Sequence, residues 1–200
     1  MLPKHLLLLA LVASLQSAHA VVDLTPTPQE YTAEGITIQQ LIFRDGKQRV
    51  SYEPPRRWAY RFDAGALTLT PPKVDRAEAV VQAMPLLPPQ PLDSRSIAVA
   101  KQQFIAALPP GSQMVEIAGE EFNPVVVDEN TSYAVTASYQ TLGETFTRCT
   151  VFINIRDTQL RFQLTARKAD FAAVNAAFRR SMMKLRWLPA AELMGGVEPK

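Results

Sequence analysis

The sequence is poor in histidine and cysteine, the two residues most often used in nucleophilic catalysis and transition-metal binding. Both histidines, His5 and His19, lie in the first 20 residues of 200, and Cys149 is the one cysteine. Without imidazole, residues 21–200 cannot build a Ser-His-Asp or Cys-His catalytic arrangement. They also cannot build a His-ligated zinc, copper or iron site. We therefore expect this part of the chain to use neither a metal ion nor a cofactor.

A single cysteine also excludes a disulfide within the chain. Cys149 lies between Thr147 and Val151 on one face of a strand-like run, which favours a small, buried, apolar side chain. A reactive thiol is the alternative, but no base lies beside Cys149 in the sequence to activate it. Pairing with a cysteine of a second chain is the less favoured reading.

The first 20 residues have the pattern of a cleavable secretory signal peptide. Lys4 supplies a positive charge, residues 6–15 form an apolar run, and Ala18-His19-Ala20 is a small-x-small cleavage site. The alternative, an uncleaved anchor, would need about 20 apolar residues, roughly twice this run. We predict cleavage after Ala20 and a mature chain that is periplasmic or secreted, with no later transmembrane segment.

Residues 21–200 also have little net charge. Lys4 is the one cation removed with residues 1–20, which leaves 20 Lys and Arg against 19 Asp and Glu. This balance argues against a general nucleic-acid or anionic-membrane surface, because such surfaces usually carry a strong basic excess. We predict a linker at 21–34, a single domain at 35–188, which is long enough for a substantial core, and a flexible tail at 189–200.

Alternating apolar and polar residues predict several strands in the first half of the chain. Asp45-Gly46 separates two such runs and is typical of a hairpin turn. The run 77–84 fits either a helix or a strand, and Val80-Val81 favours the strand. The predicted strands are residues 36–43, 48–52, 58–62, 67–69 and 77–84.

The second half is predicted to hold two helices and four strands. Asp93 or Ser94 can cap a helix that runs to about Leu108. Four strands with one buried face are then expected in an antiparallel sheet. Those strands are residues 114–118, 133–139, 145–155 and 160–164.

The last helix has the clearest amphipathic pattern. Asp170 can cap it, and apolar residues then follow at steps of three and four. Strands and helices in this order predict an α+β fold, with helices packed on an antiparallel sheet. The apolar stripe is Phe171, Val174, Phe178, Met182 and Leu185, closed by Trp187, and the opposite face carries Arg179, Arg180, Lys184 and Arg186.

Three segments resemble the PsbP-like superfamily, which includes photosystem II extrinsic subunits and bacterial periplasmic DcrB-like domains. Residues 52–58, Tyr-Glu-Pro-Pro-Arg-Arg-Trp, are similar to the strand–Pro–Trp opening of that family. Residues 168–181 are similar to its terminal helix, and residues 143–165 fit the strands before it. The resemblance covers 35–187 and implies an α/β/α sandwich in an exported protein. Metal sites of the photosynthetic members use histidines, so the resemblance carries none over to this chain.

Carboxylates and serines are the catalytic groups that remain. Glu120-Glu121 and Asp128-Glu129 could act as acid pairs, but adjacent residues on a strand point to opposite faces. Neither pair has the spacing of a calcium loop. Ser181 and Lys184 match Ser-x-x-Lys, although within an amphipathic helix, where a serine is ordinarily a packing or surface residue.

Basic residues near tryptophans form the candidate interaction surface, because Arg and Trp are enriched at protein interfaces. Its residues are Arg56, Arg57, Arg179, Arg180 and Arg186. The alternative is that these arginines only solvate a helix face. We expect a non-catalytic binding or accessory domain with a protein partner in the cell envelope. A carboxylate-based hydrolase and a carrier of a small apolar ligand are the alternatives.

Overall fold

The structure, a computed structural model, describes residues 21–189, and the predicted signal peptide and residues 190–200 lie outside this range. Eleven strands and two helices make up the described part. In chain order these are β1 (Asp23–Ala33), β2 (Ile36–Asp45), β3 (Gln48–Tyr52), β4 (Ala59–Asp63), β5 (Ala66–Thr70), β6 (Glu78–Pro85), α1 (Ser94–Ala106), β7 (Gln113–Phe122), β8 (Ser132–Thr141), β9 (Glu144–Ile155), β10 (Thr158–Arg167), α2 (Lys168–Met182) and β11 (Arg186–Leu188).

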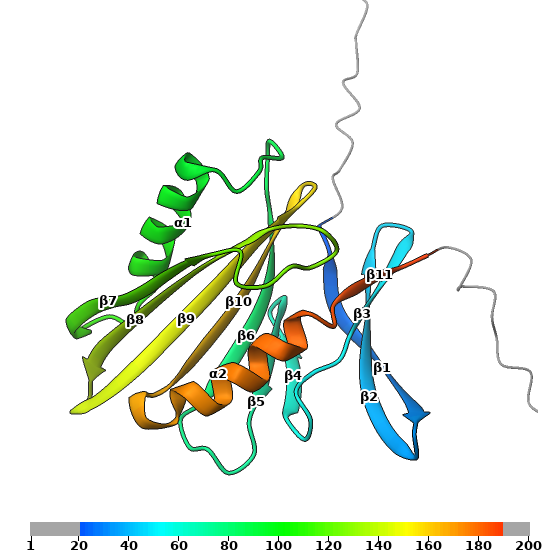
Figure 1. Cartoon of the computed structure of the whole chain (residues 1–200), viewed down its shortest axis with the longest axis horizontal. Coiled ribbons are helices and arrows are strands. Elements are labelled where there is room, and N and C mark those ends of the chain that lie inside the picture. The colour runs from blue at the N-terminus through cyan, green and yellow to red at the C-terminus, as the bar shows by residue number, and fades with distance from the viewer. Residues whose placement is uncertain (1–20, 190–200) are drawn as a thin grey trace, which may run out of the picture.

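The strands form two antiparallel sheets. The larger sheet has seven strands in the order β4-β5-β6-β10-β9-β8-β7, and the smaller sheet has four in the order β1-β2-β3-β11. Helix α1 lies on one face of the large sheet, while α2 and the small sheet lie on the other (Figure 1). The predicted α+β class is therefore confirmed.

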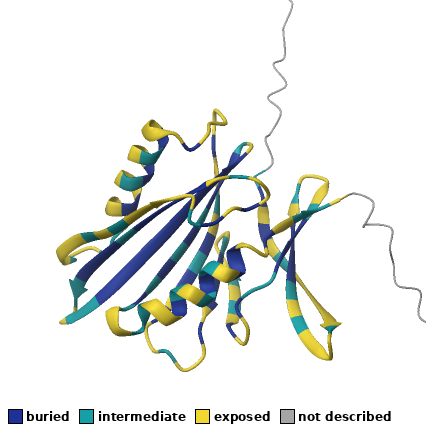
Figure 2. Ribbon diagram, in the orientation of Figure 1, coloured by how far each residue is buried: buried dark blue, intermediate teal, exposed yellow. Residues whose placement is uncertain are grey.

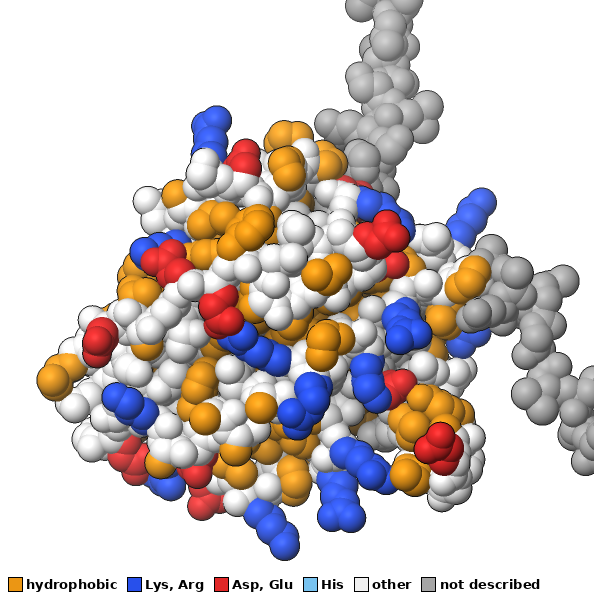
Figure 3. All heavy atoms as spheres, in the orientation of Figure 1, with side chains coloured by type: hydrophobic (Ala, Val, Ile, Leu, Met, Phe, Trp, Pro, Cys, Tyr) orange, Lys and Arg blue, Asp and Glu red, His pale blue; other side chains and the backbone are white. Residues whose placement is uncertain are grey.

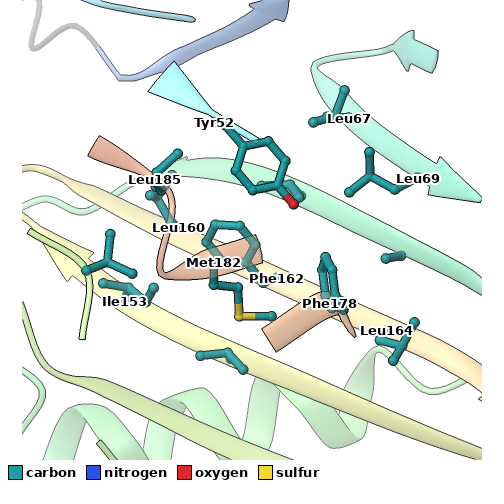
Figure 4. Packing of buried hydrophobic residues seen from close by; sticks show 14 of the residues in the cluster. Tyr52, Leu67, Leu69, Ile153, Leu160, Phe162, Leu164, Phe178, Met182 and Leu185 are labelled. Atoms are coloured by element: carbon teal, nitrogen blue, oxygen red, sulfur yellow. The ribbon is translucent and has the colours of Figure 1, made fainter. Parts of the chain in front are cut away.

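The hydrophobic core has two parts, one on each face of the large sheet. The larger part joins both sheets to α2, and in Figure 4 Tyr52 of the small sheet approaches Phe162 of the large sheet and Met182 of α2. The smaller part joins α1 to β8 and β9 through residues such as Phe104, Tyr133 and Phe152. The domain therefore has three layers: α1, the large sheet, and a third layer made of α2 and the small sheet.

Residues 21–34 were predicted to be a linker, and this prediction is wrong for most of that range. Asp23–Ala33 is strand β1, which pairs with β2. Val22 and Leu24 are buried in the core, with 5% and 4% of their surfaces exposed. The two prolines of β1 pointed away from a strand, but an edge strand tolerates residues without an N–H donor.

The prediction of one buried face for the second-half sheet is also wrong at its centre. From Phe146 to Ile155 every residue of β9 is buried, because α1 covers one face of the sheet and α2 the other (Figure 2). The alternation of apolar and polar residues on β8 and β10 suggested one exposed face, but polar residues of both strands, such as Ser138 and Gln159, are also buried.

The helix boundaries agree with the sequence in part. Asp93 caps α1 and accepts hydrogen bonds from the backbone N–H groups of Arg95 and Ser96, as predicted. At α2 the predicted Asp170 cap is wrong, because the helix begins earlier, with Arg167 at the N-cap position and no side-chain cap. Asp170 lies in the first turn, where a carboxylate is favoured by the helix dipole.

Candidate interaction surface

The loop between β3 and β4 is held against the C-terminal half of α2. The Trp58 ring stacks on Phe178 at a centroid distance of 6.1 Å and an interplanar angle of 10°. The Tyr52 hydroxyl shares a buried hydrogen bond of 2.8 Å with the Ser181 hydroxyl, which itself donates to the Phe178 carbonyl. Trp58 is 7% exposed, so it belongs to the core. These contacts position the residues on either side of Trp58 beside the helix.

Basic side chains gather where this loop meets α2. Arg56 and Arg57 precede Trp58 and are exposed, and Arg180 is exposed two residues after Phe178. Lys184 follows α2, and Arg186 begins β11. We call Arg56, Arg57, Arg180, Lys184 and Arg186 the basic rim. In Figure 3, Lys and Arg side chains are gathered on the part of the surface where α2 lies.

Glu53 is the acid that faces the basic rim. It accepts hydrogen bonds from the Lys184 ammonium and, at 2.8 Å, from the Tyr31 hydroxyl. Partial burial acts to raise the pKa of Glu53, but the hydrogen bonds from Lys184 and Tyr31 and the nearby charge of Arg186 outweigh it and lower that pKa below its ordinary value. Glu53 therefore stays ionised and neutralises part of the rim.

Arg179 is placed differently from the rim, although the sequence predicted it to be exposed with Arg180. Its side chain is 22% exposed and forms a bidentate ion pair with Glu121 of β7, at 2.8 and 2.5 Å. Its Nη2 also lies 3.7 Å from the Cys149 sulfur, and its Nε is buried without a hydrogen-bond partner. The hydrogen bond to Glu121 raises the pKa of Arg179. This arginine joins α2 to the sheet.

The acidic residues do not converge on one site. Glu120 accepts hydrogen bonds from Lys101 of α1 and from Tyr133, on the α1 side of the sheet. Its neighbour Glu121 pairs with Arg179 on the other side. Asp128 and Glu129 are exposed in the loop between β7 and β8. Within residues 21–189, no group of three or more His, Cys, Asp or Glu residues could hold a metal ion.

The nucleophile candidates occupy packing positions. Ser181 is 3% exposed and bound to Tyr52, whereas Lys184 points to Glu53, so the Ser-x-x-Lys string does not form a serine–lysine pair. Cys149 is 2% exposed, and burial raises the pKa of its thiol despite the nearby Arg179. Both results agree with the structural reading of these residues.

An apolar cavity lies between the two sheets, where a carrier would hold its ligand. Its volume of about 10 Å³ is room for about one water molecule. A small apolar ligand would need the sheets to separate. The lining residues are Val22, Leu24, Phe43, Val50, Tyr52, Val81, Leu160, Phe162 and Leu185. Among residues 21–189 no helix is long and apolar enough to cross a membrane.

Comparison with known proteins identifies the fold. The chain is similar to cyanobacterial PsbP from Synechocystis sp. PCC 6803, with a TM-score of 0.54 and 11% identity over 81% of this chain and 93% of that one. It is also similar to LpqN of Mycobacterium tuberculosis, with a TM-score of 0.51 and 10% identity over 82% and 92% of the two chains. No protein-family model and no curated protein sequence matches the chain. The described domain therefore has a PsbP-like fold.

The sequence missed two residues at this surface. Tyr31 was assigned to a linker, so its contact with Glu53 across 22 positions had no local signal. Glu53 was noted only as part of the Tyr-Glu-Pro-Pro string. The many cations near the end of α2 could have suggested that Glu53 forms an ion pair there. The sequence could not have shown that Lys184 is the cation that Glu53 binds.

Proposed function

We propose that this protein is an exported, non-catalytic accessory domain of the periplasm or cell envelope, and that it binds an acidic protein partner through the basic rim. The rim is the observation that carries the proposal. Four of its five cations form no ion pair within residues 21–189, and Glu53 neutralises only Lys184 directly. Clustered cations of this kind favour an acidic partner and speed its association.

Export is proposed from two observations. Residues 1–20 have the charge, apolar run and cleavage site of a signal peptide. The structurally similar LpqN is described as involved in cell envelope biogenesis. Intact-mass measurement of periplasmic material should find a chain beginning at Val21, and a periplasmic chain that still begins at Met1 would contradict this expectation.

Charge reversal tests the binding role. The mature chain with Arg56→Glu and Arg180→Glu should lose the partner that the unaltered chain captures from cell-envelope extracts. The matched control is Lys47→Glu with Arg95→Glu, which reverses two exposed cations at the β2–β3 turn and on α1. Because exposed charges contribute little to stability, both variants should melt close to the unaltered chain. Equal capture by both variants would rule out the rim as the docking surface.

A further inference from the structure

The β1–β2 hairpin extends beyond the core as a two-stranded arm, which in Figure 1 reaches the lower right of the view. We define the arm as residues 29–33 and 36–40, which pair one to one from Gln29↔Gln40 to Ala33↔Ile36. From Pro28 to Gln40 every residue is exposed or only half-buried. A two-stranded ribbon is only marginally stable in water on its own, so contact of the arm with a binding partner would stabilise it.

One face of the arm is apolar. The register places Tyr31 opposite Ile38 and Ala33 opposite Ile36, and residues directly opposite each other share a face of the ribbon. We call these four residues the apolar arm face. Tyr31 and Ile36 are each 40% exposed. The other face carries polar residues such as Glu30, Thr32, Thr37 and Gln39.

The apolar arm face adjoins the basic rim. The Tyr31 hydroxyl donates to one Glu53 oxygen, and Lys184 donates to the other, so one carboxylate joins the arm to the rim. Arg186 lies close enough for its charge to act on both groups. The hydrogen bond to Glu53 raises the pKa of Tyr31, an effect that Arg186 partly opposes, and Arg186 is one of the charges that hold the pKa of Glu53 below its ordinary value. In Figure 3 hydrophobic side chains at the arm border the Lys and Arg side chains on the same side of the molecule. The two features therefore form one continuous surface, apolar on the arm and cationic on the rim.

We propose that this surface binds a bipartite segment of a partner protein, in which apolar side chains contact the arm face and neighbouring Asp or Glu side chains contact the rim. The inference rests on the proposed function and adds the chemistry of the partner. Tyr31 supplies a large contact area with little loss of conformational freedom. The arginines of the basic rim, which form no ion pair within residues 21–189, supply charge-assisted hydrogen bonds to carboxylates. The apolar contact adds affinity, and the charges set the direction of the segment.

Three features of the surface favour this occupant over others. Addition of a strand to the β1 edge is disfavoured, because Pro26 and Pro28 carry no N–H to donate. A membrane is disfavoured because Glu30 and Glu34 lie near the tip of the arm, where an inserting hairpin would need apolar or basic residues. A second copy of this chain docked about a two-fold axis at the rim would bring like charges together.

A peptide-display library tests the proposal with defined probes. Selection on residues 21–200 should enrich peptides that combine aromatic or aliphatic residues with an acidic cluster, and a synthetic peptide from the selection serves as the probe. The double variant Tyr31→Ser with Ile36→Ser should bind this peptide about tenfold more weakly, as expected for the loss of an interface anchor. The control Val99→Ser with Ile105→Ser, which alters exposed apolar residues of α1 with 46% and 44% exposure, should bind normally.

The outcomes separate the two proposals. If the arm variant binds as tightly as the control while Arg56→Glu with Arg180→Glu abolishes binding, the arm inference is wrong and the rim function stands. If the rim variant also binds normally, the proposed function fails as well. Two other results would overturn the proposal of a bipartite protein segment. One is the selection of peptides that lack acidic residues. The other is tight binding of the chain to phosphatidylglycerol vesicles that is lost in the arm variant. If Tyr31→Ser with Ile36→Ser fails to fold, benzoylphenylalanine in place of Ile36 tests the contact between the arm and the peptide. On irradiation this residue should cross-link to the peptide.

Discussion

Arg179 of α2 and Glu121 of β7 form a bidentate ion pair across 58 positions of sequence. The pair ties the helix to the edge strand of the large sheet. Cys149 lies beneath it on β9, with its sulfur 3.7 Å from the guanidinium. Arg180, the next residue, points away from the sheet into solvent. Two adjacent arginines therefore have different roles, one in holding the fold together and one in the proposed surface.

The first prediction separates these arginines. Arg179→Ala should lower the free energy of unfolding by about 1–2 kcal/mol, because it removes two charge-assisted hydrogen bonds from a largely buried position. Arg180→Ala should change it by less than about 0.5 kcal/mol, as exposed charges usually do. Denaturant unfolding of both variants measures the difference. Equal midpoints for the two would contradict a structural role for Arg179.

The second prediction concerns the pH dependence of the same pair. The hydrogen bond from Arg179 lowers the pKa of Glu121 below its ordinary value of 4.5, against a smaller opposing effect of burial. A group with a lowered pKa in the folded state stabilises the protein above its unfolded pKa and loses that effect as pH falls through the folded pKa. The stability difference between the unaltered chain and Glu121→Gln should therefore be greatest above pH 4.5 and should narrow below it. A difference that stays constant from pH 7 to pH 3 would show that the carboxylate charge contributes nothing.

Trp58 gives the third prediction, on the core. Trp58→Ala should cost about 3–5 kcal/mol of stability, because the ring is buried and stacked on Phe178. Trp58→Phe keeps an aromatic ring at that position and should cost less. Thermal and denaturant unfolding check both values. A melting temperature that hardly moves in Trp58→Ala would mean that the ring is free to contact a partner.

The buried hydroxyl pair of Tyr52 and Ser181 gives the fourth prediction. Ser181→Ala leaves the Tyr52 hydroxyl buried without its partner and should cost about 1–3 kcal/mol. Tyr52→Phe leaves the Ser181 hydroxyl bound to the Phe178 carbonyl, so it should cost less than Ser181→Ala. The order of the two variants in denaturant unfolding is the measurement. The reverse order would show that the Tyr52 hydroxyl has another way to be satisfied.

The thiol of Cys149 gives the fifth prediction. Burial raises the pKa of this thiol, so the reactive thiolate is scarce at neutral pH and reagent cannot reach it without opening of the structure. Labelling by a thiol reagent in the folded protein should be at least about 100-fold slower than in denaturant. Arg179→Ala should speed labelling, because it uncovers the sulfur. Fast labelling of the unaltered protein would instead identify a reactive cysteine.

Much of the fold followed from local pattern. The alternation in residues 36–43 and 48–52 and the Asp45-Gly46 turn predicted the β2–β3 hairpin. Val174, Phe178 and Met182 of the predicted stripe form the buried face of α2, but the predicted helix was too long, because Leu185 follows α2 and Trp187 lies in β11. Val80-Val81 correctly favoured a strand at β6, which pairs with β5 and β10. The pattern was misleading at β1, because two prolines are typical of a linker. The local sequence also gave no sign that this segment pairs with β2.

The sequence by itself determined that residues 21–200 have no imidazole, that one thiol rules out internal disulfides, and which stripe of each helix is apolar. These conclusions depend only on residue types and on the periods of helix and strand, which are local properties. Only the tertiary structure decided that Arg179 meets Glu121, that Tyr31 and Lys184 share Glu53, and that the β1–β2 arm borders the basic rim. Those contacts join residues 22 to 131 positions apart, and a periodic pattern records which way a side chain faces but not which distant residue it will meet.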